Sequence, residues 1–343
     1  MHCTLLITDA WYPLDMAEHG MSPPALSALQ TLLARGRRQR RDAATAESRL
    51  CDAFGVARQS DYPIAALTLA LDGGNPGAAC WLRADPVHLQ AQRNGLVLID
   101  SGAFTIATDE ARQLTDALNR QFAADGMLFH ALRPDRWYLR LEPAPQLVTT
   151  PLPEAAGRDI DALLPQGADA LRWHARINEV QMLLSSHPVN EAREARGELP
   201  VNSIWPWGGG VAPRAPQRPF THVWSDDVTA RALAHAAEIP HEALPPSAAQ
   251  WLEHAAPDGR HLIVNDRLRG AAQYADHGGW LNAAATLDSE WLSPLIDALR
   301  RRQLSELVLW LPGAAFSYSC TITPADLWKI WRRPRPLADY APR

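Results

Sequence analysis

Two tryptophans that lead into three consecutive glycines constrain this chain more than any other feature. The stretch from His187 to Gly210 reads as a helix end, a turn and a short apolar strand, followed by Trp205, Trp207 and Gly208–Gly210. Glycines have no Cβ atoms, so their backbone N–H groups can approach a ligand or a neighbouring strand closely. Two indoles beside such a turn are costly to expose. We therefore expect this segment to form a pocket wall or a packed domain junction.

The overall composition indicates a soluble globular protein of two domains, or one α/β domain with an insertion, because the chain has 343 residues. Its formal net charge of −5 argues against a nucleic-acid partner. The four cysteines are scattered, so we expect neither a disulfide framework nor a zinc site. No segment reaches the roughly 18 consecutive apolar residues that span a membrane. We expect a cytoplasmic protein without a membrane partner.

The two ends of the chain carry the pattern of an α/β core. The apolar run Thr4–Thr8 is followed by Asp9, which predicts a buried parallel strand with a carboxylate at its end, and Pro24–Arg35 has leucines at helical spacing. From Val201 onward, apolar strands alternate with helices, which predicts a largely parallel sheet. The predicted strands are Val201–Trp205, Thr221–Trp224, His261–Asn265 and Glu306–Leu311.

The middle of the chain reads differently. An amphipathic helix over Thr108–Phe122 lies between two pairs of predicted strands, and Pro63–Leu71 is also predicted as a strand. Residues 142–165 read as a linker, and Leu171–Ser186 as a helix. We therefore expect a discontinuous core of residues 1–77 and 200–343, with residues 78–199 as an inserted α+β sub-domain. The strands of this sub-domain are predicted at Ala78–Leu89, Gly95–Ile99, Met127–His130 and Trp137–Leu141.

Two further segments stand out by composition. Arg35–Arg41, with the sequence RGRRQRR, predicts a solvated loop, and a contact with a nucleic acid or another anionic partner is the alternative. Pro324–Trp331 predicts a C-terminal helix that packs Trp328 and Trp331 on the core.

Three stretches resemble the archaeal-type cofactor-independent phosphoglycerate mutases of the alkaline phosphatase superfamily. The first runs from LRADPVHL through LVLIDSGAFTIATDEARQLTDALN to RWYLRLE. The second is the HPVN…R…G…P-x-N-S-I-W-x-W-G-x-G stretch, and the third is LLITDAWYP followed by PALSALQTLLARG. The resemblance implies an α/β fold with an alkaline-phosphatase-like, mostly parallel sheet core and an inserted α+β sub-domain. The HPVNEAR, NSIWPWGGG and DLWKIWRR patterns are most similar to the RpfE-type regulatory proteins, a shortened bacterial relative of these mutases.

The resemblance also implies a set of catalytic groups that this sequence does not complete. A phosphomutase of the superfamily needs a Ser or Thr nucleophile and two divalent metals held by Asp and His side chains. Asp9 matches the first metal-binding Asp, but Glu306–Leu311 lacks a following Asp-His pair, and the nearest histidine after Asp266 is His277. We assign no catalytic residue and expect no cofactor. Asp9, Asp266 and His277 are weak candidates for a divalent metal such as Mn²⁺ or Zn²⁺.

These observations lead to the expectation of a catalytically degenerate phosphoglycerate-mutase-like protein with a regulatory or ligand-sensing role. A small phosphorylated or carboxylate ligand would bind between core and insert, and a regulatory protein partner is possible. Asp9, Trp207–Gly210 and Asp266 should converge at one side of a single sheet. A metal-dependent phosphomutase or phosphatase with rearranged ligands, and a protein-interaction module, stay open as alternatives. The predicted ligand-binding residues are Arg83, Arg193, Asn202, Trp205, Trp207, Gly208, Gly209 and Gly210.

Overall fold

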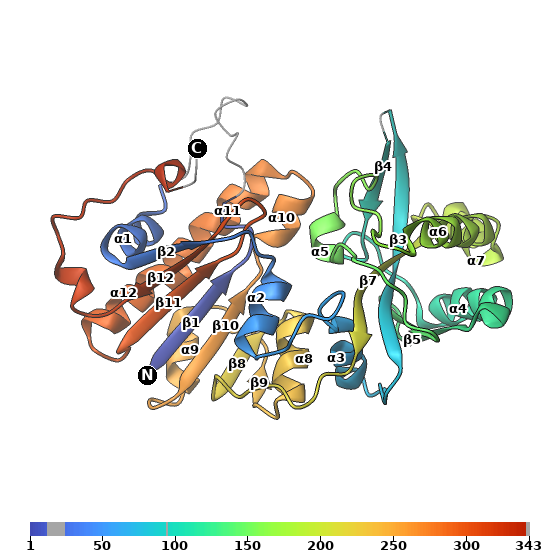
Figure 1. Ribbon diagram of the computed structural model, residues 1–343. Helices are drawn as coiled ribbons and strands as arrows, with labels where there is room; N and C mark the ends of the chain where they lie inside the picture. Colours follow the sequence, from blue (N-terminus) through green and yellow to red (C-terminus); the bar gives the residue numbers. More distant parts are fainter. Residues whose placement is uncertain (12–24, 94, 341–343) are drawn as a thin grey trace. The chain divides into compact units, whose positions relative to one another are not determined.

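The computed structural model describes residues 1–11, 25–93 and 95–340, and these residues form two compact units (Figure 1). The first unit comprises Met1–Phe54 and Gln217–Arg343, and the second comprises Gly55–Pro216. Residues 55–77 and 200–216, which were expected in the core, belong to the second unit. None of the helices in the described part of the chain is long and apolar enough to cross a bilayer.

The first unit contains a seven-stranded sheet in the order β2-β12-β11-β1-β10-β8-β9. Strand β1 pairs in parallel with β10 and β11, and β10 pairs in parallel with β8, which confirms the predicted parallel core. Strands β12 and β2 continue the sheet with antiparallel pairing. The bounds are β1 His2–Ile7, β2 Arg37–Arg41, β8 His222–Ser225, β9 His241–Glu242, β10 Arg260–Asn265, β11 Glu306–Leu311 and β12 Ser317–Ile322.

Both faces of this sheet are buried at its centre. Leu5 and Ile7 belong to the large core cluster formed with α1, α9, α11 and α12, whereas the neighbouring Leu6 points to the opposite face and is also fully buried. Such two-sided burial is typical of parallel strands, and it explains why these strands are continuous apolar runs. The helices of this unit are α1 Ser27–Arg35, α2 Ala46–Ala53, α8 Val228–Ala236, α9 Ala248–His254, α10 Arg269–Gln273, α11 His277–Leu287 and α12 Ser293–Arg300. Pro24, the predicted first residue of α1, lies outside the described residues.

The second unit is built on a five-stranded sheet in which β7 pairs antiparallel with the long strand β3. Helices α4, α6 and α7 share a core with one face of this sheet, and α3 packs on the other face against Trp81 and Tyr138. The strands are β3 Cys80–Gln92, β4 Gly95–Ile99, β5 Met127–Arg133, β6 Arg136–Leu141 and β7 Ser203–Val211. The helices are α3 Ile64–Leu71, α4 Thr108–Phe122, α5 Leu152–Ala155, α6 Ala170–Ser185 and α7 Pro188–Ala195.

Two predictions around this sheet are wrong. The run Pro63–Leu71 forms helix α3 and not a strand, because an apolar run without periodicity does not distinguish a buried helix from a buried strand. The segment from Ser203 belongs to the antiparallel sheet of the second unit and not to the parallel core. Since α3 and β7 both pack on β3, the unit boundary lies outside them.

Two predictions on the first unit are also wrong. Arg37–Arg41 is not a loop but the edge strand β2, and all five of its residues are exposed. The segment after Pro324 forms only a short 3-10 turn, Asp326–Trp328, and leaves Trp328 and Trp331 78% and 73% exposed. A helix of this length is marginal unless packing supports it.

Candidate functional site

Carboxylates gather at one edge of the parallel sheet of the first unit. The pairing register places Ile7 beside Asn265 and Val264 beside Ser225, so the three strands end together. Asp9 follows β1, Asp266 follows β10, and Asp227 follows β8. Ligand sites of α/β proteins lie outside the carboxyl ends of parallel strands. The edge is therefore the candidate site of this unit.

The cation Arg269, at the start of α10, lies among these carboxylates. Its guanidinium is 3.2 Å from Asp227 Oδ2, 3.4 Å from Glu47 Oε1 of helix α2 and 3.8 Å from Asp9 Oδ2. The Arg269 side chain is only 15% exposed. We call Asp9, Glu47, Asp227 and Asp266 the carboxylate cluster. Arg269 is not among the residues predicted from the sequence, although its position three residues after the strand-end Asp266 lets its side chain turn back toward this edge.

Burial and the charge of Arg269 act in opposite directions on the pKa values of the carboxylate cluster. Burial raises the pKa of Asp9 and of Glu47 above their ordinary values, and the Arg269 cation opposes this rise. Burial, and after it the charge of Asp227, raises the pKa of Asp266. Burial disfavours the Arg269 cation, but the surrounding carboxylates outweigh burial and raise its pKa. The Arg269 cation therefore favours the charged forms of carboxyl groups whose ionisation burial disfavours.

This arrangement does not fit the two-metal set that the resemblance implies. Asp227 is engaged twice, since Oδ1 accepts from the Ala230 N–H at 2.9 Å to cap α8 while Oδ2 faces Arg269. His277, the third weak candidate for a metal ligand, is the first residue of helix α11. Among residues 1–11, 25–93 and 95–340, no three His, Cys, Asp or Glu side chains form a group that could hold a metal ion. Asp9 and Asp266 do lie at one sheet edge, but Trp207–Gly210 belong to the other sheet, so the predicted convergence on a single sheet is wrong.

In the second unit, Arg83 is buried and forms an ion pair with Asp85. Its Nε and Nη2 atoms donate to Asp85 Oδ1 at 3.0 and 2.6 Å, and the Trp207 indole donates to Asp85 Oδ2 at 2.7 Å. Arg83 is 3% exposed and Asp85 is 1% exposed. The Arg83 guanidinium also lies 5.2 Å from the Trp207 ring centroid. Its Nη1 has no hydrogen-bond partner among the described residues.

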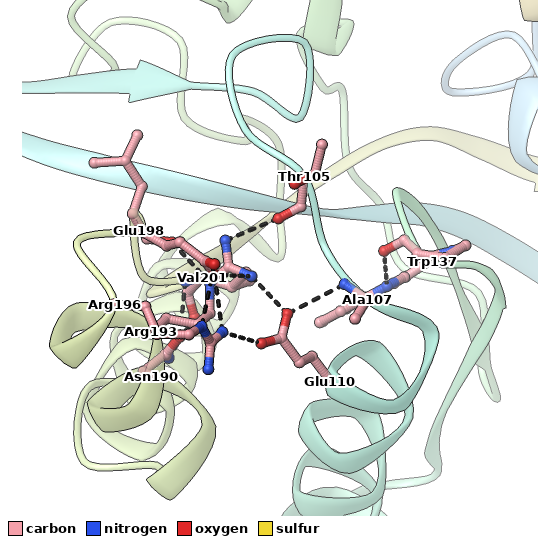
Figure 2. A network of polar contacts seen from close by, with 11 residues as sticks. Thr105, Ala107, Glu110, Trp137, Asn190, Arg193, Arg196, Glu198 and Val201 are labelled. Carbon is pink, nitrogen blue, oxygen red and sulfur yellow. Dashed lines mark hydrogen bonds and ion pairs between the residues drawn. The ribbon is translucent and has the colours of Figure 1, made fainter.

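The HPVN…R motif connects helix α7 to helix α4 through ion pairs and hydrogen bonds, as Figure 2 shows. Arg193 of α7 contacts Glu110 of α4 at 2.6 Å, and its other nitrogens donate to the carbonyls of Leu199 and Thr105. Glu110 also contacts Arg196 at 2.6 Å and accepts from the Ala107 N–H at the start of α4. Each guanidinium nitrogen of Arg193 thus has a partner within the chain. The motif explains how the end of α7 is fixed against the start of α4.

The remaining predicted residues also make internal contacts. The Asn202 side chain bonds to both backbone groups of Leu89, and the Trp205 indole donates to the Thr150 carbonyl at 2.8 Å. Gly208 has a φ of +65°, which favours glycine, and a Cβ there would lie 3.1 Å from Ile64. A Cβ at Gly209 or Gly210 would lie within 3 Å of a neighbouring side chain. The glycines therefore allow close packing, and a ligand-binding role for this set stays a prediction.

Comparison with known proteins relates the second unit to one family. Residues 75–190 match the family model for 2,3-bisphosphoglycerate-independent phosphoglycerate mutase. The chain is 31% identical over 156 residues to a probable mutase of this kind from Geobacter sulfurreducens, which covers 44% of the chain and 38% of that relative. It is 33% identical over 153 residues to the enzyme from Methanosarcina mazei, covering 42% of the chain and 37% of the relative. The chain therefore spans less than two fifths of the length of these relatives.

The fold has a counterpart among solved structures. The PH0037 protein from Pyrococcus horikoshii aligns with a TM-score of 0.53 at 12% identity, over 94% of this chain and 87% of that chain. This likeness concerns the fold alone. With the largely parallel sheet of the first unit, it confirms the expected α/β fold class.

We predict that Arg83→Met lowers the free energy of unfolding by about 3–5 kcal/mol, because it leaves the buried Asp85 carboxylate without its cation. Urea unfolding followed by circular dichroism measures the change. Arg83→Met/Asp85→Asn should recover a large part of the loss. Arg112→Ala is the control, since its pair with Asp109 is exposed and should be worth at most about 1 kcal/mol. Equal losses for Arg83→Met and Arg112→Ala would contradict the role of Arg83.

We predict that Glu47 makes the protein more stable as the pH falls from neutral toward 5. Burial raises the pKa of Glu47 in the folded state, so the folded protein keeps a proton that the unfolded chain releases. That contribution is fully present below the unfolded-state pKa and is lost as the pH rises through the folded-state pKa. The difference in unfolding free energy between wild type and Glu47→Gln should therefore shift in favour of wild type on acidification. A difference that is independent of pH would refute the raised pKa.

Proposed function

We propose that this protein is a catalytically degenerate relative of the cofactor-independent phosphoglycerate mutases, with a regulatory or ligand-sensing role of the RpfE type. The observation that carries the proposal is the Arg269 guanidinium among Asp9, Glu47 and Asp227 at the carboxyl edge of the parallel sheet. Metal-dependent phosphoryl transfer uses such carboxylates as ligands of divalent ions. Here an internal cation already engages them.

Electrostatics explains why Arg269 disfavours a metal at this edge. A guanidinium stays protonated in proteins and cannot act as a ligand, so it repels a divalent ion instead of binding it. Asp227 already uses Oδ1 to cap helix α8, so the oxygen left for a metal is Oδ2, the atom that faces Arg269. Recruiting these carboxylates for a metal would therefore cost the ion pairs of Arg269.

The second unit supports the ligand-sensing part of the proposal. It contains the whole of residues 75–190, the region related to the mutases. Within it, the buried Arg83 keeps one donor, Nη1, without a hydrogen-bond partner among the described residues. Guanidinium groups suit phosphate and carboxylate. A small phosphorylated or carboxylate compound is therefore the ligand class that we propose, and phosphoglycerates are its natural first candidates.

We predict that Arg269→Met increases the affinity for Mn²⁺ at least about tenfold, or about 1.4 kcal/mol, because it removes the cation that competes with the metal. Isothermal titration calorimetry on wild type and variant measures the affinities, and Mn²⁺ should raise the unfolding temperature of the variant more than that of wild type. Arg267→Met is the matched control, because Arg267 donates to the carbonyls of Pro245 and Pro246 and not to the cluster.

An activity assay separates this proposal from its main alternative. Wild type should not interconvert 2- and 3-phosphoglycerate with Mn²⁺, Co²⁺, Zn²⁺ or Mg²⁺. Metal-stimulated turnover that is lost in Asp9→Asn would instead show a metal-dependent phosphomutase with rearranged ligands. Calorimetric titration with the same two compounds tests the ligand-sensing part separately. Binding of either compound without turnover supports the ligand-sensing role. If neither compound binds, that role is refuted and only the proposed loss of catalysis stands.

A further inference from the structure

Strand β2 is an exposed, strongly basic edge of the seven-stranded sheet. Four of its five residues are arginines, and all five are exposed. Among the residues that the structure describes, Arg37, Arg38, Arg40 and Arg41 form no ion pair with a carboxylate. The chain as a whole carries a net charge of −5, so this strand concentrates positive charge on an otherwise acidic protein. Such segregation indicates an anionic partner.

The C-terminal segment lies against this edge. Arg35, which ends α1, donates from Nη1 to the Leu327 carbonyl at 2.7 Å, and Arg332 donates back to the Arg35 carbonyl at 3.4 Å. The Arg38 guanidinium lies 4.9 Å from the ring centroid of Tyr340. These contacts bring the exposed indoles of Trp328 and Trp331 into the neighbourhood of β2. Large exposed apolar side chains beside a charged rim are typical of interaction sites. We call Arg37, Arg38, Arg40, Arg41, Trp328 and Trp331 the arginine–indole surface.

Strand β2 also offers backbone groups. It pairs with β12 on one side, and no strand pairs with its other side among residues 1–11, 25–93 and 95–340. Nor does the backbone of Arg37–Arg41 make a hydrogen bond outside that ladder within these ranges. A free edge strand is a template for the addition of a further strand.

The charges and the edge geometry together select the partner. A second copy of β2 would bring arginines opposite arginines, which is destabilising. Successive side chains of a strand point to opposite faces, so Arg37 and Arg41 project opposite to Arg38 and Arg40. A flat bilayer would meet only one of these faces, and neither lipid nor nucleic acid continues the backbone ladder. An extended peptide with carboxylates satisfies the ladder and both sets of arginines.

We propose that the arginine–indole surface binds an extended acidic segment of a partner protein, which adds to the sheet as a strand beside β2. Its carboxylates contact the arginines on both faces of the edge, and its apolar side chains cover Trp328 and Trp331. This inference goes beyond the proposed function and does not depend on it, because none of the surface residues belongs to the carboxylate cluster.

The probe is a short fluorescein-labelled peptide in which glutamate alternates with valine, and fluorescence anisotropy measures its binding to the full chain. Arg38→Glu/Arg40→Glu should weaken binding at least about tenfold, and Trp328→Ala/Trp331→Ala should weaken it as well. Arg300→Glu/Arg301→Glu, at the exposed last residue and the C-cap of α12, carries the same change of charge and should leave binding unaltered. A peptide with N-methyl groups on alternate amides should lose binding, because it cannot complete the ladder.

Three results would overturn the proposal. One is the absence of peptide binding to wild type, and another is equal binding of the N-methylated peptide, which would show charge attraction without strand addition. The third is tighter binding of phosphatidylserine vesicles or of a single-stranded oligonucleotide that depends on the same arginines. Whether the protein shows mutase turnover or binds metal does not bear on this test, so its outcome is distinct from that of the proposed function.

Discussion

The ion pairs of Arg269 join three parts of the first unit that are distant in sequence. They connect the end of β1 at Asp9, helix α2 at Glu47 and the start of α8 at Asp227. Burial raises the pKa of Asp9 and Glu47, and without the Arg269 cation the charged forms of these two carboxyl groups would be still less favourable. The arrangement of the carboxyl edge therefore depends on a positive charge at this place, and the protein supplies it from its own chain.

A fixed internal cation has a different consequence from a metal ion. A divalent metal binds substrate oxygens and activates a nucleophile through open coordination positions, whereas a guanidinium that is engaged by carboxylates offers only hydrogen bonds. The first unit thus has a parallel sheet whose carboxyl edge already contains a positive charge, that of Arg269. The region related to the mutases, residues 75–190, lies within the second unit. The relationship of the second unit to these mutases is therefore compatible with the loss of metal chemistry that we propose for the first unit.

The elements that are predicted correctly are those whose sequence pattern is compatible with only one kind of secondary structure. Helix α4 begins and ends where its amphipathic period predicts, and the parallel strands follow from apolar runs with strand-end carboxylates. The helix α3 was mistaken for a strand because an apolar run that is buried on all sides has no period. The assignment of β7 to the parallel core failed because pairing partners are set by tertiary contacts, here with β3 through Trp207 and Arg83.

The candidate site was predictable only in part. The strand-end position of Asp9 and Asp266 follows from sequence, but Glu47 and Arg269 reach the same edge from helices that no local pattern connects. Arg193 was expected at a ligand and instead braces α4 and α7, because an arginine in a motif does not by itself distinguish a ligand contact from an internal ion pair. Trp328 and Trp331 were expected in the core, whereas their exposure reflects a turn too short to form an amphipathic face.

Anomalous diffraction at the manganese edge, on crystals of the wild-type protein grown with excess Mn²⁺, shows whether Arg269 keeps metal away from the carboxylate cluster. We expect no anomalous peak at the carboxyl edge of the parallel sheet, with density for the Arg269 guanidinium between Asp9, Glu47 and Asp227. Two peaks at that edge, with Arg269 displaced from the carboxylates, would instead show that the metal site is intact and that Arg269 does not replace it.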